Sequence, residues 1–188
     1  RPPTSNSPHT PMKRLIATLS LLAMLTACQT SSTKENPLLT ESTLDYQAPD
    51  FSKIRPEHFI PAIEEGIRIQ LAEIDSITSN TAAPTFENTV LAYEKSGRLL
   101  ARATSILSRL VGADGTEELQ KIDEETTPML SAHHDALLLN EKLFARVKAV
   151  YDQRSSLQGE DLRLTEVLYD QFVHEGALLS AADKEALK

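Results

Sequence analysis

The chain has 188 residues, of which 40% are hydrophobic and 5% aromatic, and its formal net charge is −8. The first 27 residues hold three basic side chains and no acidic one, which leaves −11 for the remainder. Such an acidic body argues against nucleic acid as a partner, because phosphates require a basic face. The only cysteine, Cys28, excludes an intrachain disulfide.

The N-terminal part has the pattern of an exported protein. Residues 1–11 are rich in Pro, Ser and Thr, and we interpret them as an upstream extension that is disordered if it is made. Residues 12–27 combine a basic start with an apolar run of 11 residues, Leu15 to Leu25. This combination is typical of a signal peptide, and the apolar run is too short to span a bilayer as a mature helix.

The signal peptide ends in Leu25-Thr-Ala-Cys28, which has the form of a lipobox. In that motif small residues admit the signal peptidase and the thiol carries a lipid, so we predict lipidation of Cys28 and a membrane anchor. The alternative is a buried apolar helix with an incidental thiol. The residue after Cys28 is Gln29 and not an Asp, and the usual sorting rule for lipoproteins then favours the outer membrane. We therefore predict that the protein is held at the outer membrane and faces the periplasm. Residues 28–35 form a short polar tether.

The body, residues 36–188, shows helical periodicity and no strand signal, which predicts an all-α fold. The first helix begins near Pro56, which suits a first-turn position. Its apolar residues recur at spacings of three and four on one face: Ile60, Ile63, Ile67, Leu71 and Ile74. Residues 79–84 are predicted to form a loop.

The second helix is predicted to begin after Thr85, whose hydroxyl can cap the first turn. Its apolar residues trace two stripes up to Val111, so we expect it to be central and packed on both sides. Gly97 within it allows close approach of a neighbouring helix. Residues 112–115 end it, with a glycine in a left-handed cap.

Four further helices complete the prediction. The third covers about Glu117 to Leu139, with a kink at Pro128. Asn140 caps the fourth, and the fifth runs from about Glu160 to Glu175. A sixth opens at Ser180 by the logic of a capping box. Because that helix is cut short at Lys188, we expect the domain to continue beyond the chain.

No constellation in the chain carries visible chemistry. His174-Glu175 begins like the zinc motif H-E-x-x-H, but Leu178 stands where the second histidine would be. His133 and His134 are neighbours that point about 100° apart on a helix, so we expect His133 to pack on the apolar face and His134 to be solvated. His58 is expected to be exposed, as are three acidic pairs: Glu64/Glu65, Glu117/Glu118 and Glu124/Glu125.

Three blocks of the chain resemble the N-terminal part of the thimet oligopeptidase group of zinc metallopeptidases, and most closely the bacterial peptidyl-dipeptidases. The first block contains Asn36-Pro-Leu-Leu39, His58-Phe-Ile-Pro-Ala62 and Glu64-Glu-Gly66. The second contains Thr85-Phe-Glu-Asn-Thr89 and Glu94-Lys-Ser-Gly97, and the third contains Gly176-Ala-Leu-Leu-Ser180 and Asp183-Lys184.

The resemblance implies a large, bilobed, nearly all-helical enzyme whose N-terminal helices wall a channel for short peptides. There, zinc is held by the histidines of H-E-x-x-H and a downstream Glu, and the Glu of the motif activates water. None of these residues occurs in this chain, so we expect no catalytic, cofactor-binding or metal-binding residue in it. Zinc and the oligopeptide substrate are expected for the full-length enzyme, and residues 36–188 for its N-terminal helical region.

Two alternatives remain open at this point. The enzyme could release dipeptides or cleave internally, since the residues that decide this lie outside the chain. The chain could instead be a stand-alone, non-catalytic helical lipoprotein of the periplasm that binds peptides or a protein partner.

Overall fold

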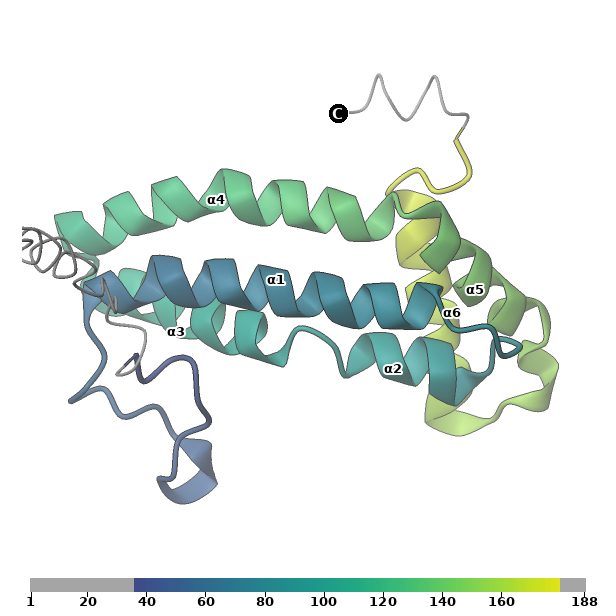
Figure 1. Ribbon diagram of the computed structural model, residues 1–188, viewed down its shortest axis with the longest axis horizontal. Coiled ribbons are helices and arrows are strands. Elements are labelled where there is room, and N and C mark those ends of the chain that lie inside the picture. Colours follow the sequence, from purple (N-terminus) through teal and green to yellow (C-terminus); the bar gives the residue numbers. More distant parts are fainter. Residues whose placement is uncertain (1–35, 180–188) are drawn as a thin grey trace, which may run out of the picture. The chain divides into compact units, whose positions relative to one another are not determined.

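The computed structural model describes residues 36–179, and in this range every regular element is helical (Figure 1). The predicted all-α fold is therefore confirmed. The upstream extension, the signal peptide, the tether with Cys28 and the sixth helix lie outside the described residues. Within that range, none of the helices combines the length and apolarity that crossing a membrane requires.

Within residues 36–179, six α-helices and four short helical turns follow one another. The turns are η2 (Asp45–Gln47), η3 (Pro56–His58), η4 (Phe86–Val90) and η5 (Arg154–Ser156). The helices are α1 (Phe59–Thr78), α2 (Leu91–Glu94), α3 (Arg98–Asp114), α4 (Glu117–Leu138), α5 (Glu141–Asp152) and α6 (Gly159–His174).

Helix α1 is the axis of the bundle. It lies along α2 and α3, with α4 beside it and with α5 and α6 gathered at the end where α1 finishes (Figure 1). The face predicted for α1 is largely confirmed, because Ile63 and Ile74 are buried and Ile60 and Ile67 partly so. Leu71 is the exception, with 42% of its surface exposed.

Two hydrophobic cores divide the bundle, and α1 contributes to both. The first core joins the N-terminal half of α1 to α3 and to the start of α4: Phe59, Ala62, Ile63, Leu100, Ala103, Ile106, Leu107, Leu119 and Ile122, with Leu38 from the preceding segment. The second core joins the C-terminal end of α1 to η4, the end of α4, α5 and α6: Ile74, Ile77, Phe86, Val90, Leu137, Leu138, Leu143, Val147, Val150, Leu168 and Phe172.

The prediction of one long second helix is wrong, because the chain breaks between α2 and α3. Gly97 adopts a left-handed conformation with φ of 69°, which costs glycine little. Its N–H no longer has a helical partner and instead donates to the Glu73 carboxylate of α1, at 2.8 Å. Close approach at Gly97 is confirmed, since a Cβ there would lie 2.4 Å from the Gln70 side chain.

The predicted helix caps at Thr85 and Asn140 are confirmed, but the predicted cap at the end of α3 is wrong. Thr85 accepts a hydrogen bond from the Asn88 N–H at 3.2 Å, and Asn140 accepts one from the Leu143 N–H at 3.0 Å, as N-caps do. Helix α3 ends at Asp114 as expected, but the left-handed cap is wrong, because Gly115 has φ of −67°. The chain there passes directly into α4, whose first turn is capped by the Thr116 hydroxyl.

Pro128 lies inside α4, where a kink was predicted. Its ring removes one backbone donor, yet α4 continues through it, and Figure 1 shows the helix gently bowed and unbroken. Pro128 and Glu124, whose carbonyl loses that donor, are both exposed, so water can replace the missing hydrogen bond.

Helices α1 and α3 lie close together at Gly66. A Cβ added to Gly66 would lie 2.8 Å from the Cα of Leu100, a distance that backbone atoms cannot accommodate without a shift of one helix. Leu100 is itself buried in the first core. The absence of a side chain at Gly66 therefore permits this packing distance.

A polar chain crosses the bundle between the two cores. Buried His133 of α4, on the apolar face as predicted, lies with Nε2 2.7 Å from Oε1 of Gln70 in α1. Gln70 Nε2 donates to Ser96 Oγ at 3.2 Å, and Ser96 Oγ donates to the Tyr93 carbonyl at 2.7 Å. Since the Gln70 oxygen can only accept, Nε2 of His133 carries a proton. Its buried Nδ1 has no hydrogen-bond partner within the described part of the chain.

We expect Gly66→Ala to destabilise the fold by about 1–3 kcal/mol, because the added methyl group forces α1 and α3 apart. Urea unfolding followed by circular dichroism measures this change. The matched control is Gly112→Ala, where a Cβ meets nothing within 4 Å. That change should raise the free energy of unfolding, by up to about 1 kcal/mol, because alanine favours the helix. Equal effects of the two substitutions would contradict the close approach.

We expect stability to fall as the pH drops below about 6.5, the ordinary pKa of histidine. Burial, with a smaller contribution from His134, lowers the pKa of His133 in the folded protein. The unfolded chain then binds a proton more readily, so stability present above this pH is lost below it. Urea midpoints at pH 7.5 and 5.5 should differ less in His133→Gln, whereas His134→Gln should keep the difference. A His133→Gln protein with the original pH dependence would refute this assignment.

Candidate functional site

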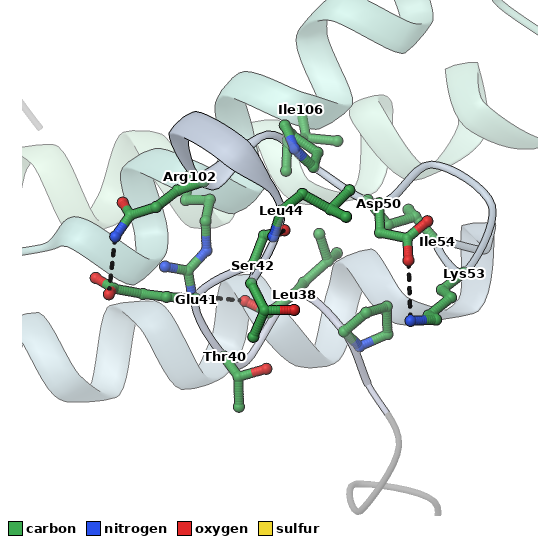
Figure 2. A pocket seen from close by; sticks show the side chains of 14 residues that line it. Leu38, Thr40, Glu41, Ser42, Leu44, Asp50, Lys53, Ile54, Arg102 and Ile106 are labelled. Atoms are coloured by element: carbon green, nitrogen blue, oxygen red, sulfur yellow. Dashed lines mark hydrogen bonds and ion pairs between the residues drawn. The ribbon is translucent and has the colours of Figure 1, made fainter.

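One described hollow lies where the segment before α1 folds back over α3. Residues 36–54, which we call the lead segment, form one wall, and Arg102 and Ile106 of α3 form the other (Figure 2). The hollow has a volume of about 280 Å³. It is open to solvent on one side, so it can admit a small polar group but does not enclose a ligand.

Arg102 fastens the lead segment to α3. Its Nη2 donates to the Leu38 carbonyl at 2.9 Å, and the Leu38 side chain is buried in the first core. The Nε of Arg102 is buried without a hydrogen-bond partner among the described residues. The Arg102 guanidinium thus holds the lead segment through one carbonyl group, and part of its capacity to donate hydrogen bonds stays unused.

The other charged groups of the hollow pair with one another. Lys53 lies 2.9 Å from the Asp50 carboxylate, and hydrogen bonds from Ser52 and Lys53 hold the pKa of Asp50 below its ordinary value. Glu41 accepts a hydrogen bond from Gln47 at 3.2 Å and lies 3.8 Å from Arg98. A carboxylate whose pKa is held low by such hydrogen bonds is a weak general base, and these contacts instead hold the lead segment together.

Asn36 and His58 close the base of the lead segment. Asn36 Nδ2 donates to the His58 carbonyl at 2.8 Å, and its Oδ1 accepts from the Leu38 N–H at 3.0 Å. The prediction that His58 is exposed is wrong in part. It is half-buried, and its Nδ1 accepts the Arg55 N–H at 3.0 Å. Both residues therefore set the backbone that enters α1.

A second polar cluster surrounds Asn88 in η4. The Asn88 Oδ1 accepts from the Thr85 N–H at 2.9 Å, from the Thr89 hydroxyl at 2.8 Å and from Nη2 of Arg146 at 3.0 Å. Its Nδ2 donates to the Ala83 carbonyl at 2.9 Å. One amide thus ties the loop before η4 to helix α5.

Arg146 supplies the charge of this cluster. It is buried, and its Nη1 donates to the carbonyls of Asn80 and Ala82 at 2.8 and 3.3 Å. A buried guanidinium is costly unless oxygen atoms surround it. The three neutral acceptors therefore make Arg146 a support for the loop, residues 79–85, that joins α1 to η4.

The remaining histidines and acidic pairs form no site. His134 is half exposed, as expected, and lies 3.8 Å from Glu175, while His174 ends α6. The acidic pairs lie on solvated faces, although Glu65 is partly buried and binds Arg68 at 2.7 Å. Among residues 36–179, no three His, Cys, Asp or Glu side chains lie close enough to hold a metal ion.

Sequence reasoning missed Arg102, Arg146 and Gln70, although the sequence contains a signal for each. Arg146 stands between Leu143 and Val150 at the spacing of an apolar face. Gln70 and Arg102 interrupt apolar stripes in the same way. A polar residue at such a position must find a partner inside the fold, but only the tertiary structure shows which one.

The N-terminal residues match a known family of sites. Residues 12–29 match the prokaryotic membrane lipoprotein lipid attachment site. Cys28, predicted from its lipobox, falls inside this match. The chain is thus a lipid-anchored protein of the bacterial envelope.

The rest of the chain is similar to bacterial peptidases. It is 46% identical over 155 residues to dipeptidyl carboxypeptidase of Salmonella typhimurium, and 44% identical over 158 residues to that of Escherichia coli. These matches cover 81% and 83% of the chain but only 23% of each relative, so the chain spans less than a quarter of their length. It is also 29% identical over 117 residues to oligopeptidase A of Salmonella typhimurium, which covers 62% of this chain and 17% of that protein.

The resemblance drawn from the three sequence blocks is thereby confirmed. The chain is homologous to the N-terminal part of dipeptidyl carboxypeptidase and of oligopeptidase A, as its resemblance to the thimet oligopeptidase group predicted.

Proposed function

We propose that residues 36–188 are the N-terminal helical region of a zinc-dependent peptidyl-dipeptidase or oligopeptidase that hydrolyses short peptides. The observation that carries the proposal is the 46% identity to a dipeptidyl carboxypeptidase across 81% of the chain. Homologues at this level of identity share a fold, and the two kinds of relative described above are peptidases by name. The substrate is accordingly an oligopeptide.

In this proposal the chain walls the substrate channel and the zinc site lies in residues outside it. The described residues do not fit zinc, because they bring no three metal-ligating side chains together. The chain also lacks H-E-x-x-H, since Leu178 replaces the second histidine. Residues elsewhere would hold the zinc ion, which would supply polarisation of the peptide carbonyl and activation of water.

What the described residues contribute is a rigid wall. Arg102 holds the lead segment against α3, and Arg146 with Asn88 holds the loop between α1 and η4. Both clusters fix loops to helices at opposite halves of the bundle. A wall of this kind lets only short peptides enter the channel, because its loops stay fixed to the helices.

The proposed location is the periplasmic side of the outer membrane. A lipid on Cys28 would hold the protein there, and Gln29 after the cysteine favours the outer over the inner membrane. Peptides released in the periplasm would then be the accessible substrates.

We expect Cys28→Ser to release the protein from membranes. The lipid-modified chain should partition into the detergent phase and carry the mass of the lipid, because acyl chains favour an apolar phase. The serine variant should remain in the aqueous phase. Intact mass and phase partitioning of both proteins measure this, and a wild-type chain that stays aqueous and unmodified would contradict the anchor.

We expect residues 36–179 to replace the aligned segment of the Salmonella dipeptidyl carboxypeptidase with retention of activity. The chimera should release dipeptides from a blocked tetrapeptide with kcat/KM within about tenfold of the parent, a loss of at most about 1.4 kcal/mol of transition-state stabilisation. Mass spectrometry of the released dipeptide, with and without a zinc chelator, gives the rate. The same chimera with Gly66→Val serves as the control with a disrupted helix contact.

The chain alone should hydrolyse no peptide and bind no stoichiometric zinc in the same assay. A chimera that folds with the thermal stability of the parent but releases no dipeptide would refute the proposal. Tight peptide binding by the isolated chain, together with such an inactive chimera, would instead identify a non-catalytic peptide-binding lipoprotein.

A further inference from the structure

Three large apolar side chains of the lead segment face solvent. Tyr46 is fully exposed, and Leu44 and Phe51 are 48% and 54% exposed. We call these three residues the apolar loop. Figure 1 shows the lead segment extending away from the ends of α1 and α3, on the side of the bundle opposite α5 and α6.

The backbone of this loop is held in a conformation that exposes Tyr46. Tyr46 and Gln47 have φ of 57° and 56°, in the left-handed region that residues other than glycine seldom occupy. Gln47 N–H donates to the Leu44 carbonyl at 2.9 Å and thereby closes the turn. Strain of this kind persists only where the surroundings impose it, and it is concentrated at functional positions.

The rest of the lead segment supplies those surroundings. Leu38 is buried in the first core and its carbonyl binds Arg102. Lys53 and Asp50 form an ion pair at 2.9 Å on the other side of the turn. These contacts therefore hold in place the segment that carries the apolar loop.

The length of chain before Asn36 limits how far this loop can be from a membrane. Eight peptide units separate Cys28 from Asn36. At about 3.5 Å per residue, even a fully extended tether reaches only about 28 Å. A lipid on Cys28 therefore keeps the lead segment within a few helix diameters of the bilayer surface.

We propose that the apolar loop inserts shallowly into the surface of the bilayer that holds the lipid on Cys28. This inference rests on the lipid anchor of the proposed function. Tyrosine suits such a site, because its ring is apolar and its hydroxyl can remain among the headgroups. Insertion would orient the bundle with α5 and α6 directed away from the membrane.

The charges near the loop indicate how it binds. Glu41, Asp45 and Asp50 outnumber Lys53 along the same segment, so anionic lipid headgroups are not attracted. The contact is accordingly apolar, and zwitterionic lipid is sufficient for it. Salt should change it little, because screening affects charge pairs and not buried apolar surface.

Hydroxyl-radical footprinting of the full chain tests this contact. The lipid-modified protein is placed in phosphatidylcholine vesicles, and oxidation of each side chain is measured by mass spectrometry. We expect oxidation of Tyr46 and Phe51 to fall by roughly threefold or more relative to the Cys28→Ser protein in buffer, because side chains below the headgroups are screened from water. Leu178, which is 60% exposed, should be oxidised equally in both.

Substitutions separate insertion from simple proximity. Tyr46→Ser with Phe51→Ser should abolish the protection of Leu44, whereas Val167→Ser, at another exposed apolar residue, should leave it unchanged. Unprotected Tyr46 and Phe51 in anchored protein would overturn the proposal. So would protection that is already present in buffer, because another protein segment or a second copy would then cover the loop.

The test keeps the two proposals distinct. Intact mass shows first whether Cys28 carries a lipid. If it does not, the lipid anchor fails, and the free thiol, the only one in the chain, can be coupled to a maleimide lipid. Footprinting of that conjugate then decides whether the apolar loop inserts, independently of how the anchor arises.

Discussion

The structure depends on the way α1 lies against the broken segment formed by α2 and α3. Gly66 lets α3 approach α1 to backbone distance, and Gly97 lets the chain break where the two cores meet. The Glu73 carboxylate then satisfies the N–H that the break exposes. Because α1 contributes to both cores, a substitution of either glycine would disturb the packing of the whole bundle.

The sequence blocks that identify the family have structural roles in this chain. Asn36 and His58 fix the backbone that leads into α1. Thr85 and Asn88 cap η4, and Asn88 also accepts a hydrogen bond from Arg146. Side chains of this kind saturate backbone groups that would otherwise be buried without a partner. The blocks thus identify a relative of peptidases through the structural requirements of its framework.

Polar connections also explain how loops are held against the helices of the bundle. Arg102 and Arg146 each reach from a helix to carbonyl groups of a loop that is distant in sequence. A guanidinium has several donors in one plane, so a single side chain can fix two or three backbone positions. The chain of contacts from His133 through Gln70 to Ser96 links α4 to α1 and to the helix break in the same way. The bundle therefore carries loops that are fixed by hydrogen bonds, together with the exposed apolar loop.

The sequence by itself determined the helical class, most helix boundaries and the lipobox, because periodicity and caps such as Thr85 and Asn140 act over a few residues. It did not determine the break at Gly97, because two apolar stripes read as one long helix until Glu73 and Gln70 of α1 are seen beside it. The partners of Arg102 and Arg146 also required the tertiary structure, since 64 and 66 residues separate the groups that meet. Contacts of that range follow from packing, which no local pattern of residues encodes.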